Sequence, residues 1–228
     1  MITDYNERAK KLSRAIEIYF GAKVEGLDSY RYYKENTTLR SWICLPLVVA
    51  LNERRDGTLD ALFNRLWSAN GVLTELTADS NSSKVFWDRG TLYAFRGAFK
   101  AAAADRALER LISYSTTRLT GPRVPYAVEA WPENGMAHLL AESALYCRIF
   151  TEGLLGLEPT GFKSFYLRPN LPAKWNHVEL KHIRAFNGDI DISLKRQKSR
   201  LNLKIYQNGQ KIMDKTMSND TKLEVKIN

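Results

Sequence analysis

The stretch ENGMAHLLAESALYCRIFTEGLLGLEPTG, residues 133–161, divides the chain into two parts. Residues 133–153 are apolar on most sides, which predicts a buried helix. Pro159-Thr160-Gly161 ends the helical pattern, and beyond it apolar residues recur at every second position, as they do in strands. We therefore predict a helical domain over residues 1–160 and an antiparallel β domain over residues 161–228.

Upstream of this stretch, two kinds of helix alternate. The spacing predicts amphipathic helices over 5–20, 58–68 and 104–119, and helices apolar nearly all round over 38–53, 87–103 and 133–153. In the first apolar helix, Pro46 predicts a kink. In a double ring of helices, the outer helices are exposed to solvent on one side and the inner helices are packed on most sides. The alternation of amphipathic and apolar helices, repeated three times, therefore indicates three helical hairpins of such a ring. A plain bundle would be similarly amphipathic throughout, and a solenoid would show a repeating consensus.

Downstream, alternating apolar and polar residues predict strands over 178–183, 190–195, 201–206 and 223–227. Gln207-Asn208-Gly209-Gln210 is typical of a hairpin turn. We expect one antiparallel sheet of about five strands with one dry face packed against the helical domain.

The positive charge is concentrated in the β domain. The whole chain carries a net charge of +9, and residues 161–228 hold 14 Lys and Arg against 6 Asp and Glu. This asymmetry indicates either an anionic partner or lysines that protect sheet edges from pairing. The β domain has no recognisable nucleic-acid recognition motif, so nucleic-acid or polyanion binding is only the third functional alternative.

Nothing in the sequence predicts a membrane span, because no apolar run approaches the ~20 residues that a span needs. The start, MITDYNERAKKL, lacks the apolar region of a signal peptide. If Met1 is the true start, we expect a cytoplasmic protein. If the chain is a fragment of a longer protein, a periplasmic or secreted location is equally compatible.

Three segments that lead into the apolar helices combine aromatic with charged or amide side chains. They are YRYYKENTTLRSW at 30–42, FWDRG at 86–90 and YAVEAWPENGMAH at 126–138. Helix N-termini present free N–H groups, and sugar binding needs aromatic faces together with hydrogen-bonding side chains. The candidate substrate-binding residues are Trp42, Trp87, Asp88, Arg89, Tyr126, Trp131, Asn134 and His138.

Several of these residues also have a purely structural interpretation. The tryptophans could be core residues at helix starts, and Asp88 could be an ordinary capping residue. His138 could be a core histidine. Glu142, deeper in the last helix, is expected to bond a neighbouring helix end.

Two carboxylates are candidates for catalysis. Glycoside hydrolysis commonly uses one carboxyl group as proton donor and a second to activate water or attack the sugar. Glu133 begins the last apolar helix beside Asn134, and Glu129 lies in the preceding loop. No Gly-rich phosphate loop, GxSxG, HExxH or Cys/His cluster of metal-ligand spacing occurs, so we expect no metal and no cofactor.

Residues 128–175, VEAWPENGMAHLLAESALYCRIFTEGLLGLEPTGFKSFYLRPNLPAKW, resemble the end of the catalytic barrel of six-hairpin (α/α)6 glycosidases. The resemblance rests on Gly156-Leu157-Glu158-Pro159, on Leu167-Arg168-Pro169 and on Leu171-Pro172-Ala173-Lys174-Trp175. The chain is most similar to glycosidase-like proteins of Bacteroidetes, and it is similar in layout to α-L-rhamnosidases and α-L-fucosidases of this barrel type. The match is good over about 120–195 and looser over 28–120.

The resemblance implies an α+β multidomain protein: a partial (α/α)6 toroid of three helical hairpins followed by a small antiparallel β-sheet or sandwich domain. It implies that Glu133 is the general base, with Glu129 as the competitor. A whole barrel has six hairpins, so the chain resembles a C-terminal half, and the proton donor would lie in a missing N-terminal half or a second chain. Such a half would expose an apolar face.

The resemblance therefore predicts part of a glycoside hydrolase acting on an oligo- or polysaccharide. The first alternative is a carbohydrate-binding or structural remnant without catalysis.

Overall fold

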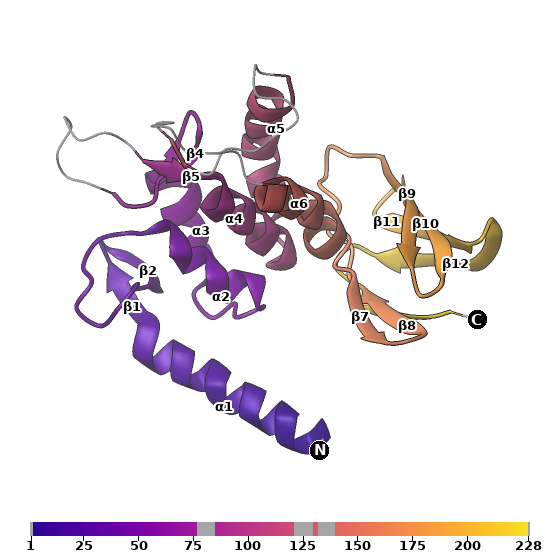
Figure 1. Ribbon diagram of the computed structural model, residues 1–228, viewed down its shortest axis with the longest axis horizontal. Coiled ribbons are helices and arrows are strands. Elements are labelled where there is room, and N and C mark those ends of the chain that lie inside the picture. The colour runs from indigo at the N-terminus through magenta and orange to yellow at the C-terminus, as the bar shows by residue number, and fades with distance from the viewer. Residues whose placement is uncertain (1, 77–84, 121–129, 132–139, 228) are drawn as a thin grey trace.

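The computed structural model describes residues 2–76, 85–120, 130–131 and 140–227. Helices and antiparallel strands both contribute to it, so the predicted α+β class is confirmed. Figure 1 shows a cluster of helices beside a β part, with the C-terminus in the β part.

Helix α4 (Asp88–Lys100) forms the centre of the helical part. Most of its residues are buried, which agrees with the apolar helix predicted over 87–103. Helix α5 (Ala104–Thr120) confirms the amphipathic helix predicted over 104–119. Around α4 pack η1 (Ser41–Cys44), α2 (Leu45–Val48), α5, α6 (Leu140–Arg148) and the π-helical turn η3 (Ile149–Leu154).

The last predicted helix, 133–153, is helical wherever it is described, since α6 continues directly into η3. Its predicted start at residue 133 lies outside the described residues.

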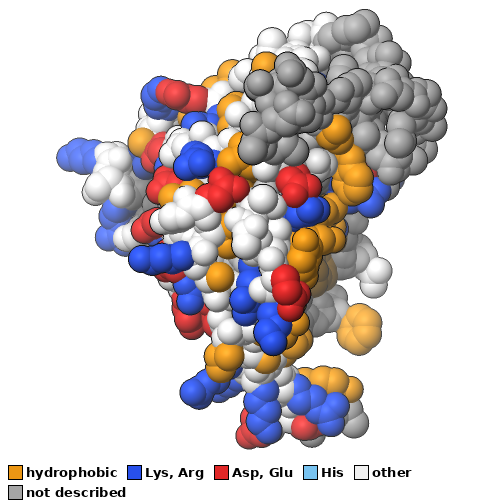
Figure 2. Space-filling model, turned by 90° about the vertical axis from the view of Figure 1, so that its left-hand side faces the viewer, with side chains coloured by type: hydrophobic (Ala, Val, Ile, Leu, Met, Phe, Trp, Pro, Cys, Tyr) orange, Lys and Arg blue, Asp and Glu red, His pale blue; other side chains and the backbone are white. Residues whose placement is uncertain are grey.

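Helix α1 (Ile2–Phe20) confirms the helix predicted over 5–20 and extends away from the other helices (Figure 1). Its apolar side chains are largely uncovered, and Tyr5 and Leu12 are both 63% exposed. Seen from the left-hand side of Figure 1, hydrophobic side chains gather in a band among charged ones (Figure 2).

A β-hairpin that the periodicity did not predict follows α1. It consists of β1 (Gly21–Val24) and β2 (Leu27–Tyr30), joined by a two-residue turn. Glu25 and Gly26 have φ values of 48° and 83°, the positive values that such a turn requires. The hairpin is tied to α1 by the Tyr30 hydroxyl, which donates a hydrogen bond to the buried Glu17 carboxylate.

The prediction of one long helix over 38–53 is wrong. The chain forms only η1, a 3-10 turn, and the four-residue helix α2, and Ala50 then has a positive φ of 63°. Pro46 lies in the first turn of α2, where its missing N–H costs no hydrogen bond, so it starts a short helix instead of kinking a long one. Ile43, Cys44, Leu47 and Val48 are buried where η1 and α2 pack against α4, whereas Leu45 and Val49 are exposed.

The helix predicted over 58–68 begins earlier and ends earlier. It comprises α3 (Arg55–Asp60) and the π-helical turn η2 (Ala61–Arg65). Trp67 belongs instead to β3 (Trp67–Ser68), which pairs with β4 (Gly71–Val72).

The β part contains two antiparallel sheets and not the single sheet that we expected. One has the order β12-β11-β10-β9, and the other has the order β13-β8-β7. The apolar sides of both sheets contribute to one core, and the last strand, β13, pairs with β8 and not with the larger sheet. The strands are β7 (Glu158–Gly161), β8 (Ser164–Leu167), β9 (His177–Ala185), β10 (Gly188–Gln197), β11 (Arg200–Gln207), β12 (Gln210–Ser218) and β13 (Leu223–Lys226).

The helical part and the β part have separate hydrophobic cores that meet at Trp175 and Val178, which pack against both. The main-chain N–H of Ala173 donates to Asp105 Oδ1 of α5 at 2.7 Å, which fixes the same junction. The domain boundary at residue 160 stays a prediction. Within the described ranges, none of the helices combines the length and apolar character that a bilayer-spanning segment requires.

Candidate functional site

Short pieces of the three predicted sugar-binding segments are joined by backbone pairing. Residues 39–41 pair with 73–76, because Leu76 N–H donates to Leu39 O at 2.9 Å and Ser41 N–H donates to Thr74 O at 3.1 Å. Residues 73–76 pair in turn with 85–87. Finally, β5 (Phe86–Trp87) pairs with β6 (Ala130–Trp131), so Trp87 lies opposite Ala130.

This pairing places an aromatic cluster at the N-terminal end of α4, which we define as Trp42, Trp87 and Tyr93. The Trp42 and Trp87 rings meet edge to face, with centroids 6.1 Å apart and planes 75° apart. Tyr93 lies one turn further along α4, with its ring centroid 6.4 Å from that of Trp42. Trp87 is 38% exposed, so the cluster is accessible from solvent.

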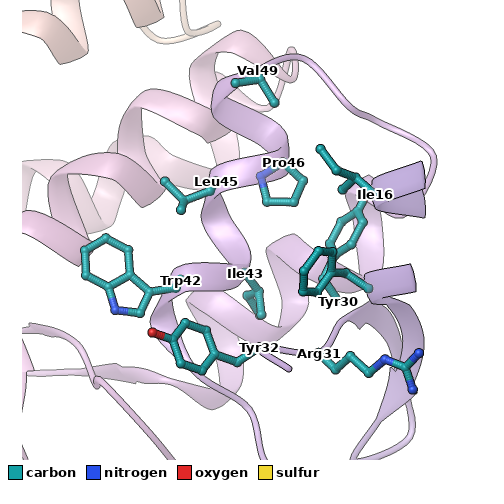
Figure 3. Close-up of a pocket in the computed structure, with 10 residues that line it drawn as sticks. Ile16, Tyr30, Arg31, Tyr32, Trp42, Ile43, Leu45, Pro46 and Val49 are labelled. Atoms are coloured by element: carbon teal, nitrogen blue, oxygen red, sulfur yellow. The ribbon is translucent and has the colours of Figure 1, made fainter. Parts of the chain in front are cut away.

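Trp42 also lines an apolar groove of about 360 Å³. The groove lies between the end of α1, the β1–β2 hairpin and the η1–α2 segment. Figure 3 shows Trp42 and Tyr32 on one side of the groove and Ile16 and Tyr30 on the other. The Arg40 guanidinium lies 5.4 Å from the centre of the Tyr32 ring, which holds this exposed aromatic side chain in place.

Asp88 is engaged in a buried ion pair. Its Oδ1 accepts from Arg118 Nη2 at 2.8 Å, its Oδ2 accepts from Arg118 Nε at 3.0 Å, and the two side chains are only 1% and 5% exposed. Burial raises the pKa of Tyr114 well above its usual value, and the nearby Asp88 charge raises it further. The ion pair ties the first residue of α4 to α5.

Arg89, one residue further on, faces α6. Its Nε donates to Oε1 of Glu142 at 2.6 Å, and Glu142 is fully buried whereas the Arg89 side chain is 39% exposed. The expectation that Glu142 bonds a neighbouring helix end is confirmed, since Arg89 belongs to the first turn of α4. Among the described residues, Glu142 Oε2 has no hydrogen-bond partner. Arg89 thus places a partly exposed cation beside the aromatic cluster.

Five of the predicted site residues lie outside the described residues. These are Tyr126, Glu129, Glu133, Asn134 and His138. Trp131 is described only through its main chain, which pairs with Phe86. The structure brings together Trp42, Trp87, Asp88 and Arg89, and their roles stay predictions.

Sequence reasoning missed two residues beside the cluster. Tyr93 lies within the apolar helix predicted over 87–103 and was not singled out, although it is one of the three residues of α4 that are not buried. Tyr32 fell inside the segment 30–42 without being singled out. For Tyr93, a signal was available in its spacing of four residues from Arg89, which puts both on one face of a helix.

One cluster of metal-ligand type occurs among the described residues, far along the sequence from the aromatic cluster. Ligand atoms of His182, Asp189 and Asp191 lie within 4.8 Å of one another. His182 Nδ1 is 3.0 Å from Asp189 Oδ2, and His182 N–H donates to Asp191 Oδ1 at 2.8 Å. These mutual hydrogen bonds account for the arrangement, and we assign no metal to it.

No protein-family model matches this chain, and no curated protein sequence matches it significantly.

Proposed function

We propose that this chain binds a glycan on the aromatic cluster of Trp42, Trp87 and Tyr93, as part of a glycoside hydrolase. The observation that carries the proposal is the edge-to-face Trp42–Trp87 pair, of which Trp87 is 38% exposed. An exposed indole offers a flat apolar face to the C–H groups of a sugar ring, and Arg89 offers donors to its hydroxyls.

The proposal includes the finer fold, a partial (α/α)6 toroid. Support comes from α4, which is buried between α5 on one side and α6 with η3 on another, as an inner helix of such a ring would be. The exposed apolar side chains of α1 are consistent with a face that a missing half or a second chain would cover. The first helical hairpin is incomplete, because residues 38–53 form only short turns.

For catalysis we propose Glu133 as the general base and Glu129 as its competitor. In the sequence, Glu129 directly precedes Ala130, whose main chain pairs with Trp87. The base would activate water while an acid from elsewhere protonates the leaving oxygen. A proton donor is not assigned to any described residue.

A second candidate, glycan binding without hydrolysis, is favoured by the state of the nearby carboxylates. Among the described residues beside the cluster, Asp88 and Glu142 are both buried and bonded to arginines. Neither is placed to donate a proton to a bound sugar. Glycan binding therefore needs only residues that the structure describes, such as Trp87 and Arg89. Hydrolysis depends on Glu129 or Glu133, which lie outside the described residues.

Titration calorimetry with neutral oligosaccharides tests the binding step. Trp87→Ala should weaken binding about tenfold or more, since a lost stacking contact costs roughly 1.4 kcal/mol or more. Phe162→Ala is the matched control, because Phe162 is fully exposed and lies in the β part. If the two variants bound the oligosaccharides with equal affinity, the aromatic cluster would not be the glycan-binding site.

The catalytic step is tested separately in the intact protein. Glu133→Gln should abolish turnover of a cleaved glycan while leaving its binding unchanged. Full turnover by Glu133→Gln would eliminate Glu133 as the base, and the same measurement on Glu129→Gln would then decide for or against Glu129.

A further inference from the structure

A second cleft, of about 520 Å³, lies at the junction of the helical part and the β part. Its walls come from the end of α2, the C-terminal half of α4, η3 and the segments flanking β7, β8 and β13. Four basic side chains and two acidic ones line it. They are Arg96, Lys100, Arg168, Lys222, Glu152 and Glu158.

Three of the four cations already face a carboxylate. Arg96 forms an ion pair with Glu152, and Arg168 Nη2 lies 2.9 Å from Asp220 Oδ2. Lys222 Nζ lies 3.5 Å from Glu158 Oε2 and 3.9 Å from the centre of the Tyr166 ring. These pairs leave little free positive charge on the three residues.

Lys100 is different. It is half-buried at the C-terminal end of α4, and among the described residues it forms no ion pair and no side-chain hydrogen bond. Burial lowers the pKa of its ammonium group, and the neighbouring Arg96 charge lowers it further. A half-buried cation without a partner is unfavourable by itself, and an anion bound beside it would relieve that cost.

We propose that this cleft binds a sugar acid, a polyhydroxylated molecule with one carboxylate, through Lys100. The charges of Glu158 and Glu152 act on Lys100 from within the cleft without contacting it, so a single carboxylate bound to Lys100 is favoured, and further negative charge on the ligand would add repulsion from both glutamates. The two glutamates can accept hydrogen bonds from hydroxyl groups, and Val49 and Leu157 supply an apolar wall for C–H groups.

The inference that the ligand carries one negative charge depends only on the cleft. The inference that the ligand is a saccharide rests on the proposed function. The cleft is built from the C-terminal half of α4, whereas Trp87, the exposed tryptophan of the aromatic cluster, directly precedes the first residue of that helix and does not line the cleft. The two sites can therefore be tested independently.

The experiment is titration calorimetry of the full chain with D-glucuronate, with neutral glucose and with inorganic phosphate. Wild type should bind glucuronate at least tenfold more tightly than either glucose or phosphate. Lys100→Met should weaken glucuronate binding tenfold or more, and Lys100→Arg should retain most of it. Lys195→Met is the matched control, because Lys195 is exposed on β10 and does not line the cleft.

Lys100→Met is expected to fold, since it exchanges a half-buried charge for an apolar side chain of similar length. Equal glucuronate affinity in Lys100→Met and Lys195→Met would overturn the proposal. So would glucose or phosphate binding as tightly as glucuronate. Trp87→Ala should leave glucuronate affinity unchanged, which separates a failure here from a failure of the glycan site.

Discussion

Arg118 Nη2 lies 2.8 Å from Asp88 Oδ1, and this ion pair joins the first residue of α4 to the last turn of α5 in an almost dry environment. Arg118 Nη2 also donates to the Asn70 carbonyl at 2.8 Å. The pair therefore fixes the end of α4 that carries Trp87. Asp88 thus has a structural role, and its predicted contact with substrate stays a prediction.

Asp88→Ala should reduce the free energy of unfolding by about 3–5 kcal/mol, because it leaves the Arg118 charge buried without its main partner. Asp4→Ala is the control, since Asp4 pairs with Arg8 in solvent, and it should cost at most ~1 kcal/mol. Urea unfolding followed by circular dichroism measures both. Similar midpoints for the two variants would contradict a structural role for Asp88.

Gly156→Ala should destabilise the protein more than Gly26→Ala. Both glycines have positive φ, 57° and 83°, so each alanine incurs about 1 kcal/mol of backbone strain. A Cβ on Gly156 would also lie 2.6 Å from the main-chain oxygen of Arg168, whereas a Cβ on Gly26 meets nothing within 4 Å. Thermal unfolding of the two variants isolates the steric contribution, and equal melting temperatures would argue against this close approach.

His182 should make stability depend on pH. Its hydrogen bond to Asp189 and the charge of that carboxylate raise the pKa of His182 above 6.5. The contribution is therefore fully present below the unfolded pKa and is lost as pH rises through the folded pKa. The urea midpoint of wild type should exceed that of His182→Gln at pH 5.5 and approach it at pH 9. A constant difference between these pH values would disprove the coupling.

The two cysteines should differ in reactivity. Burial raises the pKa of Cys44 to about 12, whereas Cys147 is exposed on α6. Since the thiolate is the reactive form, an aromatic disulfide reagent at pH 8 should titrate one thiol in the native protein and two in denaturant. Cys147→Ser should abolish the native reaction, and Cys44→Ser should leave it intact.

Local periodicity predicted the elements whose own residues follow a regular hydrophobic spacing. The amphipathic spacing at 5–20 and 104–119 appears as α1 and α5, and the apolar spacing at 87–103 appears as α4. Alternation over 190–195 and 201–206 appears as β10 and β11, which pair with each other. In these elements the hydrophobic pattern and the local geometry agree, so sequence alone suffices.

The same reasoning failed where packing overrode local preference. Residues 38–53 include several apolar residues that are buried against α4, and an apolar segment by itself does not distinguish a long helix from short turns. For the hairpin at 21–30, the Glu25-Gly26 turn was the available signal, but its strands are too short for a clear alternation.

For the candidate site, the sequence determined which segments combine aromatic and polar side chains, because composition beside a helix start can be read directly. Only the tertiary structure decided which of these side chains are free to bind anything. Trp87 is exposed beside Trp42, while Asp88 is committed to Arg118 and Glu142 to Arg89. Those partners lie 30 and 53 positions away in sequence. An ion pair over such a distance depends on the packing of whole helices, and no local pattern records it.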